Sequence, residues 1–233
     1  MNKKGLSHIE FVVSFVIFIG FIVFAFVFFN PLSSQRTLKS TMDYAWIEVS
    51  EEGKEEVETY SVSINALNNL DLKIRIDDVP IGYNASVEDV DGLPISTHRD
   101  SAGIVYFSRN SIDDRFFRIR YAKSLTDSRP PIPAATDLTG NYGISSSEVK
   151  DFYFEKLFLE LNNSYYMNYS ELKEELNLPN RMEFGFIVKF EDSEIRAVNE
   201  IPADIEVLSK NDRVEIIRAS GKREYAEVTV LVW

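Results

Sequence analysis

Apart from its carboxylates, the chain offers few side chains that could do acid–base or nucleophilic chemistry. Its 233 residues include no cysteine, two histidines and 37 acidic residues. A Ser-His-Asp arrangement would depend on His98, because His8 lies beside a long apolar run and no G-x-S-x-G turn is present. No H-E-x-x-H, phosphate loop or dinucleotide fingerprint occurs, so we expect no catalytic residue, metal or cofactor. Carboxylate pairs leave a hydrolase as a remote alternative, but a solvated acidic surface explains them more simply.

One carboxylate has an unusual position. Glu10 directly precedes the apolar run 11–29, which is broken by one serine and one glycine, and no charged residue occurs in 11–35. An ionisable group at the edge of such a run is costly without a partner, so it indicates a function. Just upstream are a basic pair and a glycine, Lys3, Lys4 and Gly5.

The apolar run predicts a membrane span. As a helix it covers about 28 Å, close to the hydrocarbon thickness of a bilayer. It contains eight of the 17 phenylalanines and is apolar on every face, whereas a core helix of a soluble protein has an apolar stripe. A removable secretory signal would have a shorter apolar region and an A-x-A-like site. A plain uncleaved anchor stays open.

The residues around Glu10 resemble a type IV prepilin signal, the class III signal of archaeal type. The matching residues are Lys3-Lys4-Gly5, then Leu6, with Glu10 five positions after the glycine. The resemblance implies that prepilin peptidase cuts between Gly5 and Leu6 at the cytoplasmic face, where Lys3 and Lys4 hold the leader. Bacterial pilins usually have Phe or Met in place of Leu6 and a C-terminal disulfide loop, whereas archaeal members are looser at that position.

The same resemblance gives Glu10 a role in assembly. Cleavage would make Leu6 the first residue, with a new positive amine, and Glu10 the fifth. In a stack of parallel helices, the Glu10 carboxylate of one subunit can meet the Leu6 amine of the next. A buried pair of this kind gives register more reliably than stability, and an assembling filament needs register.

The helix is expected to continue beyond the membrane. Pro31 predicts a kink or a break, and residues 34–50 can resume the helix. The resemblance implies that this half packs against a globular domain, and apolar residues recur along it at helical spacing: Leu38, Met42, Ala45 and Val49.

The rest of the chain predicts a β-rich ectodomain. Period-two patterns indicate strands at 57–64, 72–76, 87–90, 93–96, 104–107 and 116–121, which favour an antiparallel β-sandwich-like part. Asp91-Gly92 predicts a hairpin turn. The acidic residues around this turn could suggest calcium, but Val87 and His98 occupy positions where an EF-hand loop needs acidic ligands. The turn interpretation is therefore preferred.

The C-terminal part predicts helices followed by strands. Residues 126–146 are rich in Pro, Ser and Gly and predict a linker. A helix from Ser147 to about Leu161 and a short helix at 170–176 should follow. Strands at 184–190, 194–199, 204–208, 214–219 and 225–233 then suggest an α+β arrangement. The expected organisation is a leader (1–5), a membrane-spanning and emerging helix (6–50), a β-sandwich-like domain (51–125), the linker (126–146) and an α+β domain (147–233).

The negative charge of the chain and its three N-glycosylation sequons lie in the predicted ectodomain. The formal net charge is −12, with +1 in residues 1–35 and −13 in the remainder. This acidic balance argues against a nucleic-acid partner. Asn84, Asn162 and Asn168 begin weak N-glycosylation sequons, which an exported domain could use. Three tyrosines near two of the sequons predict either a contact surface or a packed helix junction: Tyr165, Tyr166 and Tyr169.

Together these features predict a single-pass, membrane-anchored pilin-like structural subunit, not an enzyme. Its ectodomain would lie outside the cell. The expected partners are membrane lipid, prepilin peptidase and other pilin subunits in a filament or filament-associated complex. The competing class is a single-span anchored extracellular binding protein that does not polymerise.

Overall fold

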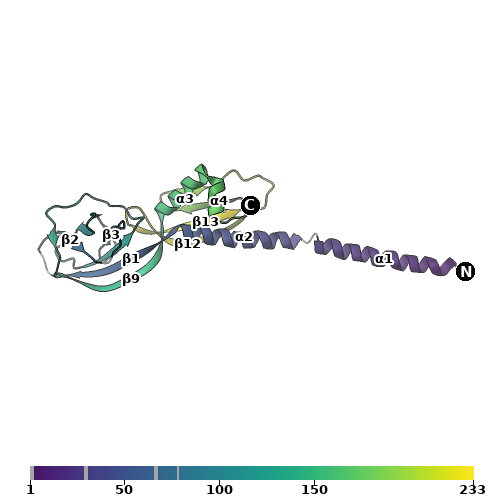
Figure 1. The fold of residues 1–233 in the computed structure, drawn as a ribbon, viewed down its shortest axis with the longest axis horizontal. Coiled ribbons are helices and arrows are strands. Elements are labelled where there is room, and N and C mark those ends of the chain that lie inside the picture. Colours follow the sequence, from purple (N-terminus) through teal and green to yellow (C-terminus); the bar gives the residue numbers. More distant parts are fainter. Residues whose placement is uncertain (1–2, 29–30, 66–67, 78) are drawn as a thin grey trace.

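The molecule has a long helical stalk and a β-rich head (Figure 1). The computed structural model describes the backbone of residues 3–28, 31–65, 68–77 and 79–233, and the stalk side chains of residues 9–26 and from 38 onward. Helices α1 (Lys3–Phe28) and α2 (Pro31–Glu52) follow one another along the stalk. Proline is well tolerated as the first residue of α2, since its missing N–H has no partner there. The expected kink or break falls beside residues 29–30, which lie outside the described backbone.

Helix α2 joins the stalk to the head through one apolar face. Met42, Ala45 and Val49 are buried at helical spacing, and Leu38 packs against the same core. They meet strands β12 (Leu208–Ile217) and β13 (Arg223–Val232). The opposite face carries exposed residues such as Asp43 and Ile47. The predicted helical continuation and its apolar spacing are confirmed.

The stalk ends where a glycine lets an aromatic ring approach the backbone. The Gly53 amide donates to the Val49 carbonyl oxygen at 3.1 Å and closes the last turn. A Cβ atom at Gly53 would lie 2.5 Å from the fully buried Phe158 ring. Because a rigid ring cannot bend away, this position accepts only glycine without repacking.

We expect Gly53→Ala to destabilise the head by about 1–3 kcal/mol, because the new methyl group overpacks the core against Phe158. Urea unfolding of the full chain in detergent, followed by tryptophan fluorescence, measures this loss. Gly143→Ala is the matched control, since its Cβ would meet only the Ser63 hydroxyl at 3.4 Å. Equal unfolding midpoints for the two variants would contradict the prediction.

A nine-stranded sheet runs through the whole head. Its spatial order is β11-β10-β13-β12-β9-β1-β7-β3-β4. Strands β12 and β9 pair in parallel, and the other neighbours pair antiparallel. Besides β12 and β13, its strands are β1 (Lys54–Ile64), β3 (Asn84–Glu88), β4 (Pro94–Ile95), β7 (Phe116–Ala122), β9 (Tyr142–Phe154), β10 (Phe184–Lys189) and β11 (Glu194–Ala197).

A second, smaller sheet closes the distal part of the head. Its order is β5-β6-β2-β8. Buried residues from the second sheet and from the distal strands of the first form one core, which includes Leu72, Ile74, Val105, Phe107, Val62, Val87 and Ile119. The four strands are β2 (Asp71–Arg75), β5 (Thr97–Arg99), β6 (Ile104–Ser108) and β8 (Thr136–Asp137).

Helices cover one face of the sheet in the part of the head nearer the stalk. Helices α3 (Glu155–Met167) and α4 (Tyr169–Glu175) bury Phe158, Leu161 and Leu172 in the same core as α2. From β13 this core receives every second residue, namely Ala226, Val228, Val230 and Val232. The alternate residues of β13 face the other way, which leaves that side of the sheet open to solvent.

The coarse prediction of one N-terminal apolar helix followed by a β-rich domain is confirmed. Most predicted strands are also found, and Asp91-Gly92 lies in the connection between β3 and β4, with Gly92 at φ 78°. The Asp89 carboxylate accepts hydrogen bonds from the amides of Asp91 and Leu93, at 3.0 and 2.8 Å. These bonds hold the predicted turn.

The main error in secondary structure concerns residues 147–154. They were expected to begin a helix at Ser147, but they belong to strand β9, and α3 starts only at Glu155. Antiparallel pairing with β1, from Tyr60↔Ser147 to Lys54↔Tyr153, supplies the backbone hydrogen bonds of this segment. Tertiary pairing therefore overrides the local pattern.

The predicted and observed secondary structure also differ at two other places. Residues 204–207, expected in a strand, precede β12, which is continuous from 208 to 217. The expected linker 126–146 contains β8 and the first residues of β9. The division into domains at 51–125, 126–146 and 147–233 stays a prediction, and the nine-stranded sheet includes strands from both sides of that linker.

Candidate functional site

Helix α1 exposes an apolar surface over its whole described length. None of the window Ile9–Phe26 is buried, and its mean hydropathy is 2.7. Large side chains such as Phe11 and Phe26 are 72% and 76% exposed. An apolar surface of this size needs a cover of lipid or protein. By length and composition, α1 could span a membrane.

Glu10 lies at the N-terminal border of this apolar surface. Its side chain is exposed, and within the described part of the chain it forms no hydrogen bond or ion pair. Lys3, Lys4, Gly5 and Leu6 belong to the first turns of α1, and their side chains lie outside those described. The roles predicted for these residues in processing and assembly therefore stay predictions.

The head holds the stalk by contacts beyond the buried face of α2. Lys210 of β12 pairs with Asp43 at 3.0 Å, and its ammonium lies 5.6 Å from the Trp46 ring centroid. Every described residue of the buried apolar cores lies at position 42 or later. Helix α2 is thus fixed to a head with its own core, and the apolar helix α1 extends from the free end of α2.

His98 has a carboxylate partner but no nucleophile. Its Nδ1 lies 2.9 Å from Oδ2 of Asp127, and Oδ1 of the same carboxylate accepts the Arg99 amide at 3.1 Å. No Ser or Thr hydroxyl among the described residues bonds to His98. In the same part of the chain, no group of three His, Asp or Glu side chains could hold a metal. Asp127 therefore ties the loop after β7 to β5.

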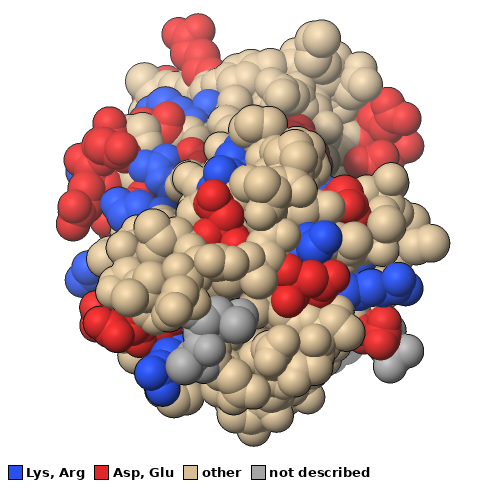
Figure 2. All heavy atoms as spheres, turned by 90° about the vertical axis from the view of Figure 1, so that its left-hand side faces the viewer, with Lys and Arg blue, Asp and Glu red and all other residues tan. Residues whose placement is uncertain are grey.

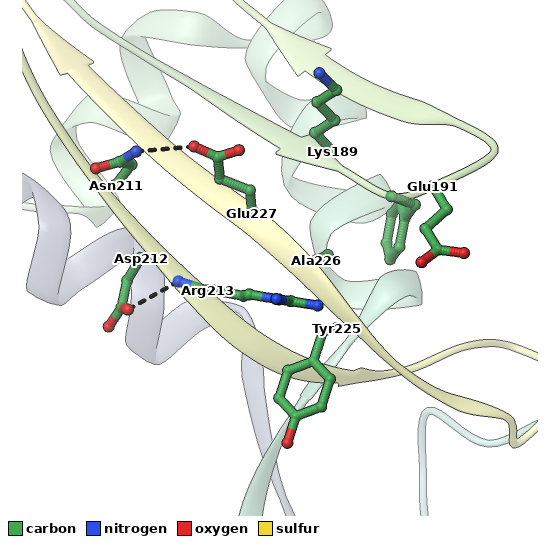
Figure 3. A pocket seen from close by; sticks show the side chains of 9 residues that line it. Lys189, Glu191, Asn211, Asp212, Arg213, Tyr225, Ala226 and Glu227 are labelled. Carbon is green, nitrogen blue, oxygen red and sulfur yellow. Dashed lines mark hydrogen bonds between the residues drawn. The ribbon is translucent and has the colours of Figure 1, made fainter.

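The open face of the sheet carries a row of alternating charges (Figure 3). Cross-strand pairing aligns Glu194, Lys189, Glu227 and Arg213, which come from four adjacent strands. Figure 3 shows the last three of them. Three of them, Lys189, Glu227 and Arg213, border a shallow hollow of about 490 Å³. In it Asn211 donates to Glu227 at 2.8 Å, and the Arg213 guanidinium lies 5.1 Å from the Tyr225 ring centroid. Opposite-charge neighbours of this kind stabilise an exposed sheet face.

The tyrosine cluster forms a packed helix junction. Tyr165 donates to the Phe184 carbonyl oxygen at 2.8 Å and accepts from the Asn199 amide at 3.0 Å. Tyr169 accepts from the Phe184 amide, and Tyr166 donates to the Arg196 carbonyl oxygen. Burial raises the pKa of Tyr165 to about 12. The junction interpretation holds for Tyr165 and Tyr169, while Tyr166 is exposed.

The three sequon asparagines differ in accessibility. Asn84 is half-buried, and its Nδ2 donates to the Leu125 carbonyl oxygen at 2.6 Å. Asn162 is also half-buried, with a buried Oδ1. Asn168 is exposed between α3 and α4. Glycosylation stays a prediction, and Asn168 is the position that offers an accessible amide.

The buried charges in the head were not predicted from sequence patterns. Glu88 is fully buried and lies beside Arg120, which is also buried. The available signal was in β7, where Arg118 and Arg120 alternate with Phe117, Ile119 and Tyr121. Such alternation predicts an exposed charged face, whereas here Arg120 is buried beside Glu88 of the neighbouring strand β3 and Arg118 is only partly exposed.

Comparison with known proteins finds no relative for this chain: no family model, no curated protein and no solved structure matches it.

Proposed function

We propose that the chain is a membrane-anchored, pilin-like structural subunit of the cell surface. The observation that carries the proposal is the exposed apolar surface of α1, uncharged from Phe11 onward, presented by an α2 whose opposite end is packed into the head. This geometry suits a subunit that is held, or joined to others, through its N-terminal helix. The residues Lys3 to Glu10 support it further by their resemblance to a prepilin signal.

In this proposal, prepilin peptidase cuts after Gly5 and the mature chain begins at Leu6. The carboxylate of Glu10, which has no partner in the described part of the chain, then pairs with the Leu6 amine of a neighbouring subunit. Pairing a charge at the edge of an apolar helix removes the penalty of leaving it alone. The head, with a sandwich-like distal part and an α+β part, projects outside the cell and has a structural rather than a catalytic role.

Processing gives the direct test. We expect chain extracted from membranes of the native host to begin at Leu6, because a glycine before the cut leaves the peptidase site free of side-chain clashes. N-terminal sequencing and intact mass measure this. A mature chain that still begins at Met1 would refute processing and leave the non-polymerising anchored protein as the better class.

We expect Glu10→Ala to abolish assembly while cleavage continues, because the carboxylate acts only after the amine has formed. Electron microscopy of surface fractions and the intact mass of the same sample separate the two steps. Glu52→Ala, at an exposed position on α2, is the matched control and should assemble normally. Normal filaments in the Glu10 variant would remove the role assigned to this residue.

A further inference from the structure

Strand β9 has an unpaired edge in the middle of the head. One side of the strand pairs with β1 from Tyr142 to Tyr153. The other side pairs only with β12, at Tyr153 and Phe154. Residues 143–151 are exposed without interruption, and Figure 1 shows β9 at the outer margin of the head beside β1. Among the strands that the structure describes, none occupies the open side of this stretch.

The backbone groups of this edge point outward in a regular row. The Phe154 amide donates to the Gly53 carbonyl oxygen at 3.0 Å, which makes these two residues a hydrogen-bonded pair of the two strands. Hydrogen-bonded and non-hydrogen-bonded pairs alternate along antiparallel strands. The N–H and C=O groups of Ser147, Val149 and Asp151 therefore face the open side. A row of unpaired donors and acceptors is a template to which another strand can add.

The open stretch is bounded at both ends. Strand β12 bounds it on the stalk side. On the distal side β9 bulges, because Ser145 is left over between the pairs Ser61↔Ser146 and Val62↔Ile144. A bulge bends the strand and interrupts regular pairing. An added strand therefore fits only between the bulge and β12.

The charges along this stretch complement those of a second copy. Glu148 and Lys150 are exposed, and neither forms an ion pair with a described residue. In an antiparallel pair of β9 strands centred on Val149, Glu148 of each copy faces Lys150 of the other. The neighbouring registers that keep the backbone groups matched place Glu148 opposite Glu148 or Lys150 opposite Lys150. Like charges directly opposite one another are destabilising, so the register centred on Val149 is selected.

We propose that two copies of this chain pair edge to edge through β9, antiparallel about Val149, so that their sheets become continuous. The same edge serves both copies, and it supplies about six backbone hydrogen bonds. A single contact of this size is weak, and many copies acting together strengthen it. Over the distal end of the head, by contrast, acidic and basic side chains are interspersed and select no partner of one sign (Figure 2). The pairing needs neither cleavage nor α1, so it is separate from the proposed function.

Antiparallel pairing sets the two stalks in opposite directions. Strand β1 follows α2 away from the stalk, and β9 returns toward it. Figure 1 shows both strands lying lengthwise with the stalk, so a two-fold axis through Val149 reverses the stalk together with the strand. With α1 anchored as in the proposed function, on which this step rests, paired copies belong to two facing surfaces. The open edge of β9 is then a homotypic adhesion surface.

Charge variants of the full chain in detergent test the pairing, with sedimentation equilibrium as the measurement. Lys150→Glu should weaken self-association about tenfold, because Glu148 of each copy then faces a glutamate. Glu148→Lys should weaken it equally, whereas a mixture of the two variants should associate like the natural chain. Lys39→Glu, at an exposed position on α2, is the matched control for net charge. Equal association of the two lysine variants, or none in the mixture, would overturn the proposal.

Single-cysteine variants report the register directly, because the chain contains no cysteine. Val149→Cys should form an intermolecular disulfide on mild oxidation, since the Cα atoms of a hydrogen-bonded pair lie about 5.5 Å apart. Ser147→Cys alone should not, because its two copies lie about 14 Å apart along the strands. Mixed with Asp151→Cys, which it faces in this register, it should cross-link. A disulfide in Ser147→Cys alone, or none in Val149→Cys, would contradict the register.

Phosphatidylcholine vesicles that carry the full chain test the orientation. The natural chain should cluster them, which dynamic light scattering detects as a rise in particle size. Vesicles with Lys150→Glu should cluster only when mixed with vesicles that carry Glu148→Lys. Disulfides of Val149→Cys in vesicles that stay apart would overturn the facing arrangement. Failure of the proposed anchoring is a distinct result, because the protein would then not float with the vesicles.

Discussion

Deletion of residues 1–30 should move the protein from the membrane fraction into aqueous solution as a folded head. The span contributes about 0.3–0.6 kcal/mol of favourable insertion energy for each Leu, Ile, Phe or Val near its centre, so the loss is large. The head should keep its fold, because every described residue of its apolar cores lies at position 42 or later. Ultracentrifugation after an alkaline wash, followed by thermal unfolding of the soluble protein, measures both results.

The matched control is a deletion of residues 1–5 alone, which keeps the whole apolar run and should leave the protein in the membrane. A 1–30 deletion variant that still sediments with membranes would show that the head itself binds lipid or an anchored partner. Loss of cooperative unfolding in the soluble variant would show instead that the head needs α1. Either result would contradict the separation of stalk and head described above.

Replacement of Glu88 should destabilise the head more than any exposed charge does. The carboxylate is fully buried and takes a bidentate pair from Arg120, with the Nη2–Oε2 bond at 2.9 Å. Arg223 and Arg118 lie 3.3 and 3.6 Å from its oxygens. Burial lowers the pKa of Arg120, and Glu88 opposes that shift. Without Glu88 the Arg120 charge is left buried and unpaired.

We therefore expect Glu88→Ala to cost about 3–5 kcal/mol of unfolding free energy. Urea unfolding of the full chain in detergent measures it. Glu194→Ala is the control, because its exposed pair with Arg196 should contribute less than about 1 kcal/mol. Glu88→Met combined with Arg120→Met should recover part of the loss, since it removes both charges. If Glu88→Ala lowers the unfolding free energy no more than Glu194→Ala does, then water or other groups already solvate Arg120.

The Glu88 cluster also joins the two parts of the head. Glu88 is on β3 in the distal part, whereas Arg223 begins β13 beside the stalk. Thr126, which follows β7, donates its hydroxyl to the carbonyl oxygen of Ala219 in the turn before β13, at 2.6 Å. A Cβ at Gly221 in the same turn would clash with the Ser86 hydroxyl of β3. These contacts couple the distal part to the stalk side, so a force on one is transmitted to the other.

Elements with a strong periodic signal were predictable from the sequence. The apolar run of α1, the spacing of Met42, Ala45 and Val49, and the alternation in β10 each predict one structure whatever lies around them. The segment 147–154 has no such signal, because nearly all of β9 is exposed. Its conformation depends on β1, which lies more than 80 residues earlier, and local patterns cannot report such pairing.

The candidate sites divide in the same way. Lys3, Lys4, Gly5, Leu6 and Glu10 are adjacent in sequence, so a short motif could suggest their chemistry before any fold was known. The environments of Glu88 and Arg120 could not be predicted, because each residue looks like an ordinary surface charge. Burial and partnership arise from strands and loops that are distant in sequence.

The sequence by itself determined that an uncharged helix adjoins an acidic, β-rich remainder, since hydropathy and charge are local properties that need no partner. Only the tertiary structure decided that one sheet runs through the head, that α2 is fixed to it, and that Arg120 is buried beside Glu88. The physical reason is that burial and pairing are properties of neighbours in space. Whether a charged side chain in a strand is exposed or buried in an ion pair depends on which other segments pack against it.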